Sequence, residues 1–148
     1  MELITTYICK NFDIGIHDNM FGGTLMSLID DAAASYAAQL CDTPRIVTIK
    51  FAELIFKKPV KTGNILKIYG KVVAFGNTSL ELYVEVRKHN VYTGEQETVT
   101  HTNVKFVRID EEGNPIPISE RVKLRYAERI EKYGKGLLSK EEKHEQMD

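Results

Sequence analysis

Residues 20–40 read MFGGTLMSLIDDAAASYAAQL, the longest run of the chain that combines helix-favouring and apolar residues. Glycines near its start let the backbone turn sharply, and the alanines, leucines and methionine that follow favour helix. Apolar residues cover most of the circumference, which is typical of a buried helix. Because two acids interrupt the run, we predict a buried helix over roughly 22–40 and no membrane span.

The two acids, Asp30 and Asp31, face different directions, since successive residues lie about 100° apart around a helix. Asp31 shares a polar stripe with Thr24, Ser27 and Ser35 and is expected at the solvated edge. Asp30 lies closer to the apolar side, where an ionised carboxylate is costly unless it is hydrogen-bonded. Two interpretations of Asp30 stay open, namely a buried acid that caps a nearby loop and a catalytic carboxylate.

Length and composition indicate one globular domain. The 148 residues suffice for a sizeable core, and 43% hydrophobic and 28% charged residues are ordinary for a soluble protein. A net charge of −1 gives no electrostatic reason to expect nucleic acid or an anionic membrane as a partner.

The cysteines and the N-terminal residues indicate where in the cell the protein resides. Cys9 and Cys41 show no CxxC or metal-binding spacing, which favours two unpaired thiols in a reducing environment. The first residues carry no basic segment followed by a long apolar core, so no signal peptide is expected. We therefore predict a cytoplasmic protein.

Most of the remaining chain alternates between apolar and polar residues with the period of a β-strand. A first strand is predicted over 3–10, followed by a loop at 11–19 and then the helix. Four more strands follow, separated by glycine and proline turns: 45–56, 64–75, 78–88 and the segment from the turn at 93–95 through Ile109.

Alternation also predicts which strand residues face the core. In the strand over 78–88, the inward residues are Leu80, Leu82, Val84 and Val86. Its outward residues are Glu81, Glu85 and Arg87. In the strand over 45–56, one side carries Val47, Ile49, Phe51 and Ile55. The other side carries Thr48, Lys50, Ala52, Leu54 and Phe56.

One long helix and about five antiparallel strands imply an α+β fold. The sheet must curl around the helix to bury it, and its edges then need a partner, which predicts a dimer. The predicted domain spans 1–118. Ser119 can cap a last helix, so that 119–134 is expected to pack on or near the domain, and the charged tail 135–148 is expected to be mobile.

Three ordered motifs resemble those of a known family. FGGTLMSLID at 21–30 opens the long helix, Val47-Thr48 together with FKKPVKTG at 56–63 forms a segment that leads into the next strand, and GNTS at 76–79 forms a turn. Over about residues 3–118, this combination resembles the hotdog-fold acyl-CoA thioesterases of the bacterial YciA and mammalian cytosolic acyl-CoA hydrolase type. The resemblance implies a curled sheet around one central helix, the hotdog fold.

The resemblance also implies the activity, which is hydrolysis of acyl-CoA to free acid and coenzyme A without a metal or redox cofactor. Asp30 matches the family's helix aspartate, a nucleophile or a general base for water, and Asp31 is the alternative position. Amides at a helix N-terminus suit a developing oxyanion, and Gly22 and Gly23 would leave room for the thioester.

The loop before the helix departs from the family. Members often carry an asparagine and a glycine where this chain has Gly15 and Asp18. In the family, the asparagine acts on the site of a partner subunit, within dimers or trimers of dimers. His17 and Asn19 are the candidates to replace it, and the alternative for each is a loop residue that bonds its own backbone.

Coenzyme A carries phosphates, so the site entrance needs cations. Three lysines of the second motif are the candidates: Lys57, Lys58 and Lys61. Backbone and hydroxyl groups of the third motif are the candidates for contacts with the pantetheine: Gly76, Thr78 and Ser79. The alternatives are a solvated basic turn and a plain turn between strands.

The sequence lacks the motifs that are typical of other kinds of active site. The histidines show no paired-ligand spacing, so no metal site is predicted, and no nucleophile elbow or Walker loop is present. Two rivals to the thioesterase stay open. One is a non-catalytic acyl-CoA or acyl-carrier binding protein, and the other is a hotdog dehydratase or hydratase, which the lack of a matching catalytic histidine motif disfavours.

Overall fold

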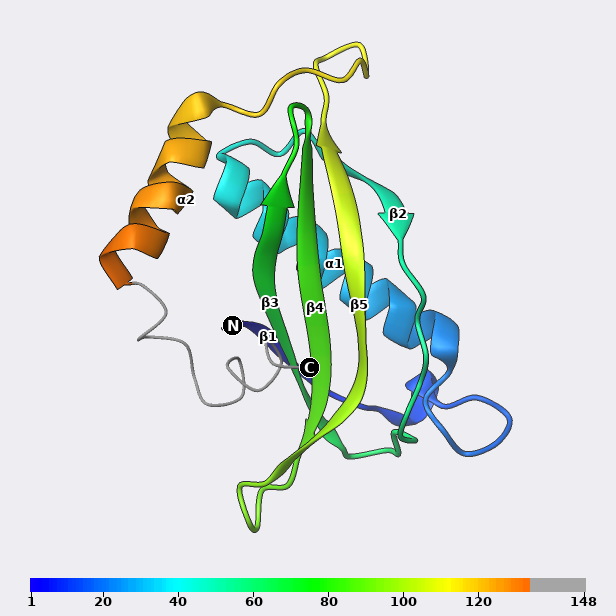
Figure 1. The fold of residues 1–148 in the computed structure, drawn as a ribbon. Helices are drawn as coiled ribbons and strands as arrows, with labels where there is room; N and C mark the ends of the chain where they lie inside the picture. Colours follow the sequence, from blue (N-terminus) through cyan, green and yellow to red (C-terminus); the bar gives the residue numbers. More distant parts are fainter. Residues whose placement is uncertain (134–148) are drawn as a thin grey trace.

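The computed structural model describes residues 1–133, with side chains described through Ala127, so the predicted tail 135–148 lies outside the described residues. The elements are β1 (Glu2–Ile8), η1 (Asn11–Asp13), α1 (Gly22–Cys41), β2 (Ile46–Phe51), β3 (Ile65–Phe75), β4 (Ser79–His89), β5 (Gln96–Arg108) and α2 (Glu120–Tyr133). Their order is the predicted one, with a short 3₁₀ helix added in the loop (Figure 1).

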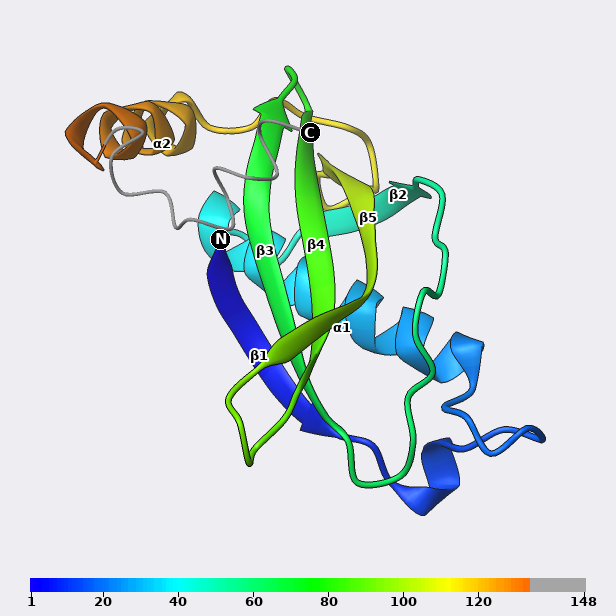
Figure 2. The same cartoon turned by 60° about the horizontal axis from the view of Figure 1, so that its bottom comes forward.

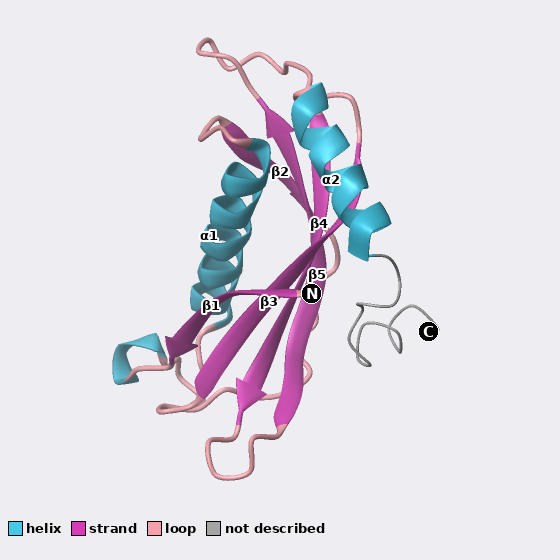
Figure 3. Cartoon of the chain, turned by 90° about the vertical axis from the view of Figure 1, so that its left-hand side faces the viewer, coloured by secondary structure: helices cyan, strands magenta, loops and turns pink. Residues whose placement is uncertain are grey.

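One antiparallel sheet contains the five strands in the order β1-β3-β4-β5-β2. Figure 2 shows β1 and β2 at opposite edges. The sheet curls around α1, which lies against one face and contacts every strand (Figure 3). The predicted inward residues of β4 are almost completely buried in this core: Leu80, Leu82, Val84 and Val86. The predicted α+β architecture is therefore confirmed.

Sequence signals at both ends set the limits of α1. The helix begins at the paired glycines and ends at Cys41, just before Pro44. Asp42 forms the C-cap with a left-handed φ of 55°, and its amide donates to the carbonyl of Ala38. The face toward the sheet carries mainly small or aliphatic side chains: Leu25, Ile29, Ala32, Ala33 and Ala37. Small residues let the helix lie close to the strands.

A β-bulge changes which side of β2 faces the core. The register with β5 shifts just after Thr48, so one extra residue inverts the alternation. Ile46, before the bulge, and Phe51, after it, both pack in the core. Val47 and Ile49 are 38% and 53% exposed. The prediction that Phe51 shares a side with Val47 and Ile49 is therefore wrong.

Beyond Phe51 the chain follows β5 without forming the regular ladder that was predicted to continue. The hydroxyl of Thr100 donates to the carbonyl of Ile55 at 2.6 Å, and the hydroxyl of Thr102 donates to the carbonyl of Ala52 at 3.2 Å. Side-chain hydroxyls thus replace some of the backbone donors of a strand. The segment stays at the sheet edge but is free to diverge toward the start of α1.

The opposite face of the sheet contains a buried ion pair. Glu85 and Arg87 of β4 are only 4% and 7% exposed, although alternation directs them away from α1. Arg87 Nε donates to Glu85, and the hydroxyl of Tyr83 donates to Glu85 at 2.6 Å. The guanidinium lies 4.6 Å from the ring centre of Tyr69. Glu85 and Arg87 point away from the core, which suggested that they would be exposed. Aromatic rings from β3 and β4 cover them instead.

The helix α2 packs where β1 leaves the edge of β3 unpaired. β1 pairs with β3 only over residues 65–70. Farther along, the hydroxyl of Tyr126 donates to the carbonyl of Val72 at 3.2 Å, and its ring lies edge-on to Phe75 at 5.4 Å. The helix therefore satisfies a strand carbonyl that β1 does not reach.

The same helix contacts the C-terminal end of α1. Arg121 and Arg125 lie 3.1 and 3.0 Å from the carboxylate of Asp42, and Arg125 also donates to the carbonyl of Leu40. Cations are favourable at a helix C-terminus because the last carbonyls carry partial negative charge. These contacts hold α2 against both α1 and the sheet.

Candidate functional site

The N-terminus of α1 presents two unused backbone donors. The amides of Thr24 and Leu25 both donate to the carbonyl of Phe21, at 3.0 and 3.2 Å. The amides of Gly22 and Gly23 find no acceptor in the described part of the chain. They lie at the positive end of the helix dipole, where an anion or a developing oxyanion is stabilised.

Two aromatic rings lie against these glycines. A Cβ at Gly22 would come within 3.2 Å of the Phe56 ring, and a Cβ at Gly23 would meet the Phe21 ring at 2.7 Å. Phe21 and Phe56 remain 61% and 45% exposed. The glycines therefore admit two apolar rings beside the free amides.

Asp30 lies on the same helix face as Gly23. It follows Gly23 by seven residues, which places it about 20° from Gly23 around the axis and about 10 Å along it. Helix side chains lean toward the N-terminus, which shortens this separation. Between them, Met26 is 41% exposed. Asp30 is half-buried, whereas Asp31 is exposed, as their places on the helix predict.

The contact partner of Asp30 is a strand residue. The hydroxyl of Thr48, in β2, donates to Asp30 Oδ1 at 2.7 Å. Within the part of the chain that the structure describes, Asp30 therefore bonds a strand residue and does not cap a loop, which was the alternative interpretation. Thr48 was not among the predicted site residues. Two signals were available, the match of Val47-Thr48 to the family's motif and a polar residue inside the apolar strand sequence Ile-Val-Thr-Ile.

The loop over 14–20 projects beyond the start of α1 (Figure 1). A bridge between Ile14 and Met20 closes it, and Asp18 at its tip adopts a φ of 59°, which explains why glycine suits this position in the family. His17 is exposed and makes no hydrogen bond with the described residues. The buried Oδ1 of Asn19 also lacks a partner there. A single chain therefore does not bring either residue to Asp30.

The lysine turn lies at the same end of the molecule as the start of α1. The carbonyl of Val60, within this turn, accepts a hydrogen bond from the amide of Met20 at 2.7 Å. Lys57 Nζ lies 3.1 Å from Nε2 of His101, and the neighbouring Lys58 and Lys61 are exposed. The structure therefore brings the lysines near the helix amides but leaves them on the surface.

The third motif, residues 76–79, lies at the other end of the sheet (Figure 1). The 11 residues of β3 separate it from the lysine turn, and a strand of that length spans roughly 35 Å. The carbonyls of Asn77 and Thr78 accept hydrogen bonds from Ile118 and Arg108. Within one chain, Gly76, Thr78 and Ser79 are therefore not brought together with Asp30 and the lysines.

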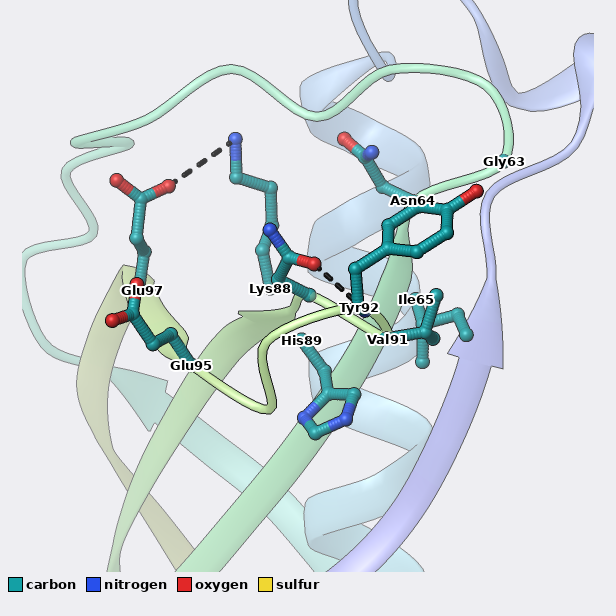
Figure 4. A pocket seen from close by; sticks show the side chains of 10 residues that line it. Gly63, Asn64, Ile65, Lys88, His89, Val91, Tyr92, Glu95 and Glu97 are labelled. Atoms are coloured by element: carbon teal, nitrogen blue, oxygen red, sulfur yellow. Dashed lines mark hydrogen bonds and ion pairs between the residues drawn. The ribbon is translucent and has the colours of Figure 1, made fainter.

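A groove of about 550 Å³ lies between the start of β3 and the β4–β5 hairpin (Figure 4). Lys88 in this groove donates to the carbonyl of Pro59 at 3.0 Å and lies 3.7 Å from Glu97. A second carboxylate, Glu95, lines the same groove. Lys88 is thus already engaged in contacts within the protein, and Glu95 and Glu97 would repel phosphate. The groove therefore does not suit coenzyme A.

Cys9 and Cys41 are free thiols, as predicted, and are only 1% and 5% exposed. Burial raises the pKa of both thiols, so neither is a candidate nucleophile. Among the residues placed by the structure, no three His, Cys, Asp or Glu side chains gather to bind a metal ion. No helix in that part of the chain has the length and apolarity to cross a membrane.

Comparisons with known proteins agree with this fold. Residues 17–95 match the sequence model of the family described as Thioesterase superfamily. An uncharacterized acyl-CoA thioester hydrolase of Bacillus subtilis (strain 168), YkhA, is 35% identical over 129 residues, which cover 80% of this chain and 74% of that protein.

Two solved structures are also similar. A hexameric hotdog fold thioesterase of Campylobacter jejuni is 34% identical with a TM-score of 0.77, covering 86% of this chain and 97% of that one. An acyl-CoA hydrolase of Staphylococcus aureus, in complex with butyryl coenzyme A, coenzyme A and coenzyme A disulfide, is 30% identical with a TM-score of 0.73. The coverage there is 86% of this chain and 88% of that one.

Proposed function

The chain belongs to the thioesterase superfamily, and from that premise we propose that it is an acyl-CoA thioester hydrolase with Asp30 as its catalytic carboxylate. One observation carries the proposal. One helix presents the unused amides of Gly22 and Gly23 and, seven residues beyond Gly23, a hydrogen-bonded carboxylate. The acyl-CoA hydrolase relatives support the substrate class.

Each group has a role in the hydrolysis. The amides of Gly22 and Gly23 donate to the thioester oxygen and stabilise its negative charge in the transition state. Asp30 removes a proton from water while the water oxygen bonds to the carbonyl carbon. The carbon–sulfur bond then breaks, and the proton passes to the thiolate, which yields free acid and coenzyme A. Attack by the carboxylate itself, followed by hydrolysis of the resulting anhydride, is the alternative route.

A homo-oligomer would complete the site. Exposed apolar side chains gather around the start of α1, along β2 and on the segment that follows it: Phe21, Met26, Val47, Ile49, Ile55 and Phe56. β2 is also an edge strand whose outer side has no partner in the described chain. Exposed apolar area next to an unpaired edge supports association with a second copy.

We propose a dimer in which β2 pairs with β2 of a second copy around a two-fold axis. Antiparallel pairing would set opposite ends of the two sheets side by side. The turn at 76–79 of one copy would then lie near the helix amides of the other, and the loop with His17 and Asn19 would reach across the interface. A trimer of such dimers would give a hexamer, the state of the Campylobacter jejuni thioesterase.

Turnover of acyl-CoA tests the function directly. The full chain should release free thiol from a panel of acyl-CoAs of increasing chain length, with kcat on the order of 1–1,000 per second for the preferred substrate. A thiol reagent can follow the reaction, because the protein's own cysteines are buried. If the chain binds acyl-CoA and releases no thiol, the non-catalytic binding protein is the correct interpretation.

The lysine turn should contribute to KM. Replacing Lys57, Lys58 and Lys61 together with alanine is expected to raise KM for acyl-CoA about tenfold with kcat within about twofold, because each exposed contact with phosphate contributes modestly. The difference from wild type should shrink at high ionic strength.

Two controls separate phosphate binding from other effects. An acyl-pantetheine substrate lacks the nucleotide phosphates and should show the same KM with wild type and with the triple variant. Replacing the exposed Lys105 with alanine should leave KM for acyl-CoA unchanged. Equal losses with both substrates would contradict a phosphate-binding role for the turn.

A further inference from the structure

We propose that Asp13 is a positioning residue that fixes the start of α1 and with it the amides of Gly22 and Gly23, an inference that rests on the proposed function. Asp13 is only 4% exposed, and the hydrolysis gives it no step. In the described part of the chain it forms no ion pair, so its carboxylate is satisfied by neutral donors. Burial of a carboxylate without a cation costs free energy, which the hydrogen bonds that it accepts must offset.

A single oxygen of Asp13 makes both contacts of the side chain. Oδ2 accepts from the hydroxyl of Tyr7 in β1 at 2.8 Å and from the backbone amide of Lys10 at 2.8 Å. The hydrogen bond to the carboxylate raises the pKa of Tyr7, so that its hydroxyl remains a donor at neutral pH. Asp13 therefore ties the loop after β1 back to that strand.

The backbone of Asp13 in turn holds the N-cap of α1, which is Phe21. The carbonyl of Asp13 accepts from the amide of Phe21 at 2.8 Å. The carbonyl of Phe21 then accepts from the amides of Thr24 and Leu25 in the first turn of the helix. A continuous series of hydrogen bonds therefore runs from Tyr7 through Asp13 to the start of α1.

The residue at the N-cap explains why the helix start needs this support. Phe21 has no side-chain oxygen, and α1 has no side-chain cap. A serine or aspartate at this position would accept from the second or third amide of the helix, which belong to Gly23 and Thr24. Such a cap would compete with the thioester oxygen for Gly23. An apolar N-cap leaves both glycine amides unused, and Asp13 fixes the backbone in place of a side-chain cap.

The anchor would act on kcat. Donors to an oxyanion stabilise the transition state because they are held in place before the reaction, and loss of one donor slows such reactions about a hundred- to a thousandfold. Displacement of the donors should cost part of that factor. Asp13 does not belong to the lysine turn, so KM should change little.

The test replaces Asp13 with leucine, which removes the acceptor, and with asparagine, which keeps it. Both hydrogen bonds end on Oδ2, so an asparagine oxygen in the same place can accept both. Asp13→Leu is expected to lower kcat about ten- to a hundredfold with KM within about twofold. Asp13→Asn should keep kcat within about threefold of wild type, in contrast to Asp30→Asn, which removes a proton acceptor.

Tyr7→Phe is a milder variant, because it removes one hydroxyl and keeps the ring. It is expected to lower kcat about three- to tenfold with KM unchanged. Tyr69→Phe is the matched control, since it removes a hydroxyl that bonds Gln96 on the face of the sheet away from α1. Its kcat should stay within about twofold of wild type. Circular dichroism at the assay temperature gives the folded fraction to which each kcat is referred.

The variants separate this role from others. If Tyr7→Phe keeps the wild-type kcat, and folded Asp13→Leu does as well, the positioning role is overturned. If Asp13→Asn loses as much activity as Asp30→Asn, the carboxylate of Asp13 acts through its charge or as a base, and the positioning role is again wrong. If Asp13→Leu does not fold, Tyr7→Phe and Asp13→Asn decide. A wild-type chain that releases no thiol from acyl-CoA would instead overturn the proposed function itself.

Discussion

Replacing Asp30 with asparagine is expected to lower kcat for acyl-CoA hydrolysis about a thousandfold, because an amide cannot accept the proton of the attacking water. The substitution keeps the size of the side chain, and its oxygen can still accept the hydrogen bond from Thr48. KM and thermal stability should therefore change little. Release of free thiol at saturating acyl-CoA measures the loss, and thermal unfolding shows that the variant is folded.

Asp31→Asn is the matched control. Asp31 carries the same side chain on the next residue of α1, but it is exposed. Its replacement should keep kcat within about twofold of wild type, the usual outcome for an exposed side chain away from the site. Loss of activity in Asp31→Asn together with retention in Asp30→Asn would show that the wrong aspartate has been assigned.

Replacing Arg87 with methionine is expected to lower the free energy of unfolding by about 3–5 kcal/mol. The change leaves Glu85 buried at 4% exposure without the guanidinium that neutralises it. Removing one partner of a buried ion pair costs more free energy than the pair itself contributes. Urea unfolding followed by circular dichroism, at a fixed protein concentration because an oligomer is expected, measures the difference.

Two further variants test this explanation. Glu85→Gln combined with Arg87→Met removes both charges and should recover most of the lost stability. Arg45→Met breaks an ion pair with Glu111 of similar chemistry, 3.2 Å apart, but with side chains that are 50% and 72% exposed. Its effect should stay below about 1 kcal/mol, because solvent screens exposed pairs. Equal effects of Arg87→Met and Arg45→Met would contradict the role of burial.

Local patterns predicted the elements that depend on near neighbours in the chain. Paired glycines and Pro44 bracket α1, and strict alternation identified the buried side of β4. The helix positions of Asp30 and Asp31 also distinguished the half-buried acid from the exposed one. A cytoplasmic location and the absence of a cofactor stay predictions.

The parts of the site that were not predicted depend on pairing between distant segments. The β2 bulge inverts the alternation, so the simple period-two pattern places Phe51 on the wrong side and misses Thr48. Likewise, β3 carries the motif at 76–79 to the far end of the sheet. The register of the strands sets the distance between such segments, and the order of residues in the sequence does not give that register.

The amino-acid sequence by itself determined the central helix, the strand content, the half-buried place of Asp30 on that helix and the family, because helix propensity, side-chain period and short motifs act over a few residues. Only the tertiary structure decided which residue holds Asp30, which charges are buried and which motifs share one end of the molecule. Those features follow from strand register and close packing, which join residues far apart along the chain.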